Sequence, residues 1–160
     1  MTAYVAVVGA GDALDGSPEV DAAEAVGRAL ASAGAVVVCG GLGGVMAAAC
    51  RGASEAGGTT IGILPGSSRA DGNPWLTVAL PTGLGEARNA LVVRSADVLV
   101  AVGGGYGTLS EIGVALRTGT PVVGVGTWEL ARAGAPDAGI ERMTSPEEAV
   151  RRALELSRSS

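Results

Sequence analysis

No lysine, histidine, phenylalanine or glutamine occurs in this sequence of 160 residues, and all 11 basic residues are arginines. Without lysine the chain cannot form a Schiff base with a carbonyl compound or pyridoxal phosphate, and it has no phosphate-loop lysine. Without histidine it has no Ser-His-Asp triad and no imidazole to bind a metal ion or shuttle protons. Acid–base chemistry is therefore left to aspartate, glutamate, tyrosine and cysteine side chains.

Positive charge and cysteine are also scarce. The net charge is −5 and the pI is near 4.7, whereas proteins that bind nucleic acid usually present a basic face, so no nucleic-acid partner is expected. The two cysteines, Cys39 and Cys50, are too few for a structural zinc site or an iron–sulfur cluster, and we expect no metal site. They are expected to be free, buried thiols in a reducing compartment, with a single disulfide as the alternative.

Long apolar runs are absent as well. No stretch approaches the ~20 residues that a membrane-spanning helix needs, and no basic segment precedes the short apolar run near Met1, so neither a membrane span nor a signal peptide is expected. The sequence thus predicts a cytoplasmic protein. Hydrophobic residues make up 48% of the chain and charged residues 17%, which predicts one globular domain over residues 1–160.

Short apolar runs, rich in valine, alternate along the chain with helical patterns. Because these runs are continuously apolar, the strands should be buried on both faces, which is typical of a parallel sheet. The sequence therefore predicts an α/β fold with a single doubly wound, mostly parallel sheet and helices on both faces. The expected strands are 4–8, 35–39, 59–64, 75–80, 97–102, 121–125 and 140–143. Helices are expected to begin near residues 18, 45 and 84, within 103–107, and near 146, with 127–139 left ambiguous.

Glycine clusters follow three of the predicted strands, at Gly9 and Gly11, at 40–44 and at 103–107. Ligands of doubly wound sheets bind outside the carboxyl ends of the strands, where glycines let backbone amides approach an anion closely. The turns therefore predict a small phosphorylated ligand, although a tight strand-to-helix turn alone also favours glycine. The expected ligand contacts in the first two turns and the helix after them are Gly9, Gly11, Gly40, Gly41, Gly43 and Met46.

The first of these turns does not suit a nicotinamide dehydrogenase. Residues 9–14 keep only the first two glycines of G-x-G-x-x-G, and the second strand ends at Cys39 without an acidic residue. Such an acidic residue is what binds the ribose hydroxyl of NAD. We therefore exclude that class.

Arg88 and Glu111 are the strongest pair of candidate functional residues. The helix expected over 84–95 is about 18 Å long and leads away from the carboxyl edge of the sheet. The strand expected over 97–102 returns by about 20 Å, so both residues should lie at that edge. Two structural alternatives stay open: Glu111 as the last residue of a capping box that starts at Thr108, and Arg88 as a surface charge paired with Glu86 or Asp97.

Three motifs resemble the Lonely Guy (LOG) superfamily: Gly-Gly-Leu-Gly-Gly-Val-Met at 40–46, Gly-Ile-Leu-Pro at 62–65, and Gly-Gly-Gly-Tyr-Gly-Thr-Leu-Ser-Glu at 103–111. The resemblance implies a Rossmann-like fold and a homodimer or homotetramer with its site near a subunit interface. Enzymes of the superfamily hydrolyse nucleoside 5′-monophosphates to a free base and ribose 5-phosphate. By position, Arg88 and Glu111 match the catalytic pair. The phosphate-binding turn of the superfamily corresponds to Gly104, Gly105, Gly107 and Thr108.

Two departures set this chain apart from the enzymes. Asn89 replaces the lysine of their Arg-Lys pair, and Gly103 replaces the proline of their glycine-rich segment. Together with residues 82–89, these changes look more like the branch containing molybdenum cofactor carrier proteins, which bind a phosphorylated pterin without chemistry. A label of lysine decarboxylase, which some relatives have carried, is untenable in a chain without lysine.

Three functions follow from this resemblance. The first is a carrier that requires no cofactor of its own and binds a nucleoside monophosphate or the molybdenum cofactor. The second is a phosphoribohydrolase, in which Glu111 stabilises the oxocarbenium ion or activates water while Arg88 orients the substrate. The third, a nucleotide-sensing domain, is less favoured because the chain carries no effector domain.

Overall fold

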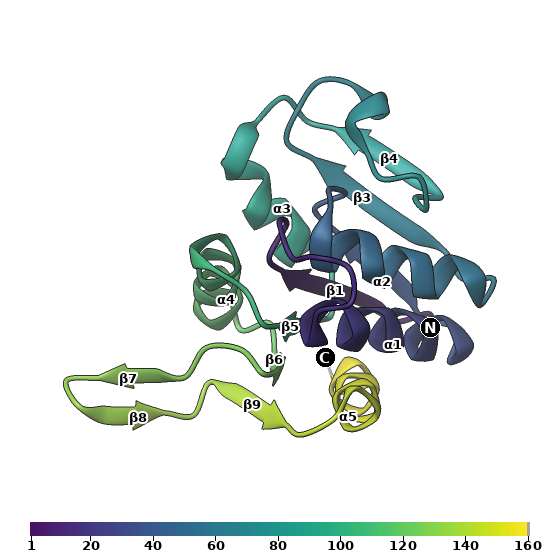
Figure 1. Ribbon diagram of the computed structural model, residues 1–160. Coiled ribbons are helices and arrows are strands. Elements are labelled where there is room, and N and C mark those ends of the chain that lie inside the picture. The colour runs from purple at the N-terminus through teal and green to yellow at the C-terminus, as the bar shows by residue number, and fades with distance from the viewer. Residues whose placement is uncertain (160) are drawn as a thin grey trace.

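The computed structural model describes residues 1–159, so Ser160, the last residue of the expected domain, lies outside it. The described chain forms a seven-stranded sheet in the order β4-β3-β2-β1-β5-β6-β9, with every neighbouring pair parallel (Figure 1). The expected doubly wound α/β fold is thereby confirmed. The strands are β1 (Tyr4–Gly9), β2 (Val36–Cys39), β3 (Thr60–Leu64), β4 (Val78–Pro81), β5 (Val98–Val102), β6 (Val122–Val125) and β9 (Ile140–Met143).

Helices cover both faces of the sheet (Figure 1). On one face, α1, α2 and α5 pack against Val5 and Val7 of β1, and on the other, α3 and α4 pack against Ala6 and Val8. This alternation along β1 explains why its residues are all apolar. The helices are α1 (Pro18–Ser32), α2 (Gly44–Glu55), α3 (Asn89–Arg94), α4 (Tyr106–Thr118) and α5 (Pro146–Ser157). No helix of residues 1–159 is long and apolar enough to cross a membrane.

The helices differ in how their first turns are capped. Helices α1 and α5 begin after Ser17 and Ser145, whose hydroxyls accept hydrogen bonds from the amides of Val20 and Glu148. Helices α2 and α4 begin after the glycines Gly43 and Gly105, which have no side chain to accept such a bond. The first-turn amides of α2 and α4 thus lack a side-chain partner at the carboxyl edge of the sheet.

Two expected elements are shorter than their patterns indicated. The helix expected over 84–95 is a 3₁₀-helix, η2 (Gly85–Arg88), followed by α3, because Gly85 has a φ of +57° and cannot belong to an α-helix. The strand expected from Trp75 starts only at Val78. Asn73 holds residues 75 and 76 in a turn, where its side-chain oxygen accepts the amide of Trp75 at 3.1 Å.

The segment 127–139, which its pattern left ambiguous, contains a β-hairpin. Strand β7 (Leu130–Arg132) pairs antiparallel with β8 (Ala135–Asp137). The turn between them places Ala133 and Gly134 at φ values of 50° and 82°, as a tight hairpin requires. The hairpin projects from the body of the protein beside β9 (Figure 1).

Candidate functional site

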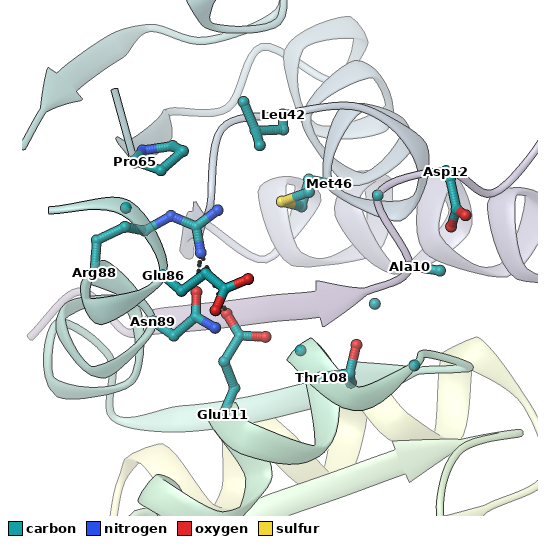
Figure 2. Close-up of a pocket in the computed structure, with 15 residues that line it drawn as sticks. Ala10, Asp12, Leu42, Met46, Pro65, Glu86, Arg88, Asn89, Thr108 and Glu111 are labelled. Carbon is teal, nitrogen blue, oxygen red and sulfur yellow. Dashed lines mark hydrogen bonds and ion pairs between the residues drawn. The ribbon is translucent and has the colours of Figure 1, made fainter. Parts of the chain in front are cut away.

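A cavity of about 470 Å³ opens at the carboxyl edge of the sheet, where the glycine turns were expected to bind a ligand. Its walls come from the turn after β1, the start of α2, the end of β3, the segment around η2 and the first two turns of α4 (Figure 2). The lining residues are Gly9, Ala10, Gly11, Asp12, Leu42, Met46, Pro65, Gly85, Glu86, Arg88, Asn89, Gly105, Gly107, Thr108 and Glu111.

Arg88, the last residue of η2, is buried in the wall of this cavity with only 8% of its surface exposed. Its Nη1 donates a hydrogen bond to the Asn89 side-chain oxygen and lies 4.0 Å from Glu111 Oε1 (Figure 2). Its Nε has no hydrogen-bond partner among residues 1–159. The surface-charge interpretation of Arg88 is therefore wrong. Asp97, one of its suggested partners, instead accepts the backbone amide of Tyr4 at 2.8 Å.

Glu111 lies in the second turn of α4, with 6% of its surface exposed. Burial raises the pKa of its carboxyl to about 7, even though the nearby Arg88 guanidinium lowers it. The capping-box interpretation is wrong, because the N-cap of α4 is Gly105 and Glu111 therefore lies beyond the first turn. A buried acid beside a buried arginine is the arrangement that the helix and strand lengths predicted.

The first turn of α4 forms the opposite wall. Gly105 and Gly107 line the cavity, and a Cβ atom on either would meet no other atom within 4 Å. Packing within the chain therefore does not explain why these two positions are glycine. Their small size keeps open the approach to the first-turn amides and to the buried Thr108, an arrangement that suits an anion.

The other expected ligand-binding residues fall into two groups. Gly9, Gly11 and Met46 line the cavity. Gly40, Gly41, Gly43 and Gly104 do not line it. Gly40 instead makes room for side chains that do, since a Cβ there would lie 2.6 Å from Arg88 Nη2 and 2.8 Å from Met46 Sδ.

Residues 2–150 match the SLOG cluster4 family. The chain belongs to this family. The match, together with the structures described next, confirms the resemblance to the LOG superfamily indicated by the glycine motifs.

Several proteins are similar to this chain along most of its length. The molybdenum cofactor carrier protein of Chlamydomonas reinhardtii is 34% identical, covers 100% of both chains and has a TM-score of 0.85. The molybdenum cofactor binding protein of Rippkaea orientalis is 31% identical over 98% of each chain, with a TM-score of 0.84. An uncharacterized protein of Archaeoglobus fulgidus is 39% identical over 149 residues, or 91% of each chain. DNA processing protein A of Helicobacter pylori, at 20% identity and a TM-score of 0.71, shares the fold alone.

The sequence did not single out several of the residues that line the cavity. Leu42 and Pro65 lie inside the glycine motifs but carry no chemistry that would single them out. Asp12 is an exposed carboxylate in a turn, and Glu86 is an exposed carboxylate in the short 3₁₀-helix η2. The position of Glu86, two residues before Arg88, was the one available signal. Asn89 stands out in the sequence only as a departure from the enzymes, and it lines the cavity beside Arg88.

Cys39 and Cys50 are free thiols in the structure, with their Sγ atoms 3.4 Å apart. Both are buried in a small cluster with Met46. Across residues 1–159 there is no group of three or more histidine, cysteine, aspartate or glutamate side chains placed to hold a metal ion.

Proposed function

We propose that this protein binds a small phosphorylated ligand, a nucleotide or a molybdenum-cofactor-type pterin phosphate, and carries it without cleaving it. The proposal rests on the buried Arg88, whose Nε lacks a hydrogen-bond partner among residues 1–159. On the other side of the cavity from Arg88, helix α4 begins with a turn that no side chain caps. A buried guanidinium without a full set of acceptors is stabilised by an anion. The similar carrier proteins of Chlamydomonas and Rippkaea support the choice of ligand class.

In the proposed complex the terminal phosphate lies against the first-turn amides of α4 and the Thr108 hydroxyl, with Arg88 as its cationic partner. Gly105 and Gly107 leave the space that this approach needs. The ring system of the ligand lies along the apolar side of the cavity, beside Leu42 and Met46. When the molybdenum cofactor is the ligand, its metal is cargo and needs no protein ligand in this arrangement.

Carriage is favoured over hydrolysis by Asn89, which leaves the Glu111 carboxyl without the second positive charge of the Arg-Lys pair. With its pKa raised to about 7, the carboxyl is protonated in a large fraction of molecules near neutral pH. A protonated carboxyl can donate a hydrogen bond to a ring or ribose oxygen, but it stabilises an oxocarbenium ion poorly. A lysine at position 89 would add a positive charge that favours the ionised form, and this chain has Asn89 there.

Hydrolysis of nucleoside 5′-monophosphates is the second candidate, because Arg88 and Glu111 line one cavity at 4.0 Å from each other. In that reaction the ionised Glu111 would stabilise positive charge at the anomeric carbon or activate a water molecule. The two functions differ in whether bound nucleotide is released intact or as a free base.

We also propose that the protein is a homodimer or homotetramer. Apolar side chains on the edge strand β4, on the segment before η2 and on α3 are exposed to solvent in the single chain, namely Val78, Leu80, Leu84 and Leu91. A second copy of the chain would cover them. Light scattering of the purified protein tests this, since a monomer at micromolar concentration would contradict it.

Binding is tested by calorimetric titration with guanosine 5′-monophosphate, whose guanine shares the 2-amino-4-oxo pyrimidine ring of pterins. Guanosine, which lacks only the phosphate, is the matched control ligand. We expect saturable binding of the nucleotide and affinity for the nucleoside that is at least about tenfold weaker. Equal affinity for both, or no binding of any nucleoside monophosphate or pterin phosphate, would contradict the proposal.

A further inference from the structure

Two buried thiols that the proposed function does not use lie next to the cavity. Cys39 is the last residue of β2, and Cys50 lies in the second turn of α2. Neither side chain is exposed, and their Sγ atoms are in hydrogen-bond contact at 3.4 Å. A disulfide has an S–S distance of about 2.0 Å, so the two sulfur atoms need to approach by only ~1.4 Å to form one.

The hydrogen bonds give the two thiols different acidities. The Gly41 amide donates to Cys39 Sγ at 3.3 Å. The contact between the thiols raises the pKa of Cys39 and lowers that of Cys50, which fits Cys39 as the donor and Cys50 as the acceptor. Since the thiolate is the reactive form, Cys50 is the thiol that reacts first.

The dithiol is connected to the proposed ligand site through Gly40. This residue follows Cys39 directly and packs against the ends of the Arg88 and Met46 side chains, so that a Cβ on it would lie 2.6 Å from Arg88 Nη2. Met46 belongs to the cluster around the two cysteines and also lines the cavity, where it lies across from Arg88 (Figure 2). A movement of Cys39 toward α2 therefore displaces Gly40, against which the guanidinium of Arg88 packs.

We propose that Cys39 and Cys50 form a reversible disulfide, and that its formation moves Gly40 and Arg88 and so weakens ligand binding. Only the last part, the effect on the ligand, rests on the proposed function.

The oxidant that forms the disulfide is a peroxide. The Cys50 thiolate attacks one peroxide oxygen, which releases water or an alcohol after protonation and leaves a sulfenic acid on Cys50. The Cys39 thiol then attacks the Cys50 sulfur, a second water leaves, and the disulfide forms.

Disulfide formation is tested on the full-length, reduced protein with hydrogen peroxide, which is removed by catalase before free thiols are alkylated. Mass spectrometry should show a product that lacks two hydrogen atoms, carries no alkyl group and reverts with dithiothreitol. The product should be absent from Cys50→Ala, a change that the alanine-rich helix α2 accommodates, and from Cys39→Ala. Wild-type protein that keeps two alkylatable thiols, or gains only oxygen atoms on methionine, overturns the proposal.

The movement of Gly40 and Arg88 on oxidation can be measured without a ligand. In ¹⁵N NMR spectra the Gly40 amide and the Arg88 Nε–H signals should shift on oxidation and return on reduction, with no shift in peroxide-treated Cys50→Ala. Unchanged signals in the oxidised protein overturn the proposed coupling.

The effect on the ligand is measured with guanosine 5′-monophosphate, whose affinity should fall about tenfold on oxidation. Equal affinity in both redox states overturns the effect on binding. If reduced protein binds no phosphorylated probe, the proposed function fails and this effect with it, while the mass and NMR results still decide the disulfide and the displacement.

Discussion

Arg88 Nη1 and Glu111 Oε1 lie 4.0 Å apart with both side chains more than nine-tenths buried, yet the pKa of Glu111 is raised to about 7. Burial thus outweighs the attraction of the arginine for the carboxylate. Arg88 Nη1 also donates a hydrogen bond to the Asn89 side-chain oxygen. The result is a buried cation beside an acid that is close to half protonated at neutral pH, in a cavity whose wall also carries the exposed carboxylates of Asp12 and Glu86.

The raised pKa of Glu111 gives the first testable consequence. Because the carboxyl holds its proton more tightly in the folded than in the unfolded protein, its contribution to stability is present at low pH and is lost as the pH rises through about 7. For this group alone the free energy of unfolding should fall by about 2–3 kcal/mol between pH 5 and pH 8. Urea unfolding at both pH values should show that Glu111→Gln removes this decrease.

Glu86→Gln is the control for that experiment, because it removes an exposed carboxylate from the same cavity. It should keep the difference between the two pH values seen in the wild type. If Glu111→Gln keeps that difference as well, the carboxyl of Glu111 is ionised in the folded protein throughout this range.

Removal of Arg88 should abolish most of the affinity for phosphate. In Arg88→Met the apolar part of the side chain is largely kept, and the charge-assisted hydrogen bonds to the ligand are lost. The affinity for guanosine 5′-monophosphate should fall by about 10- to 100-fold in calorimetric titrations. Arg94→Met removes an exposed arginine six residues away and should bind like the wild type. Equal losses in both variants would indicate only a general effect of net charge.

Replacing Gly107 should affect nucleotide affinity and the free energy of unfolding in opposite directions. Alanine at this helical position meets no other atom within 4 Å, so Gly107→Ala should raise the free energy of unfolding by about 0.5 kcal/mol. Because Gly107 lines the cavity, the added methyl group should weaken nucleotide binding about tenfold. Gly113→Ala on the same helix also meets no atom, lies outside the cavity and should change stability alone. Unchanged affinity in Gly107→Ala would place the phosphate elsewhere.

Asn89 allows a change of charge without a change of shape. Asn89→Asp puts a carboxylate against Arg88, where it competes with the phosphate for the guanidinium. Nucleotide affinity should fall about tenfold or more. Asn89→Ala, which removes the hydrogen bond to Arg88 without adding charge, should cause a smaller loss. The opposite ranking would show that Asn89 acts mainly by holding Arg88 in place.

Much of the fold follows from sequence pattern, because strands buried on both faces must be apolar throughout. Residues 97–102 were expected as a strand and form β5 (Val98–Val102). The convergence of Arg88 and Glu111 was also predictable, since it depends on the lengths of a helix and a strand, and the break at Gly85 changes those lengths little. The hairpin at 130–137 carries no such periodicity and depends on local turn geometry.

The cavity walls were less predictable than the sheet. Whether a glycine faces a cavity or makes room for a side chain depends on packing between distant segments. Gly105 faces open space, whereas Gly40 lies against Arg88, although both belong to similar glycine-rich turns. Asp12 reaches the cavity from a turn, for which neither helical nor strand spacing specifies a direction. Glu86 reaches it from the 3₁₀-helix η2, where the sequence predicted an α-helix.

Carriage without cleavage is tested most directly by a chromatographic assay for free base. Purified protein is incubated with a panel of nucleoside 5′-monophosphates, beside Glu111→Gln, and bound and free nucleotide are measured in the same samples. We expect nucleotide to bind the wild type and to be recovered intact, with no free base above the buffer control. Free base released by the wild type and absent with Glu111→Gln would contradict the proposal and identify a phosphoribohydrolase.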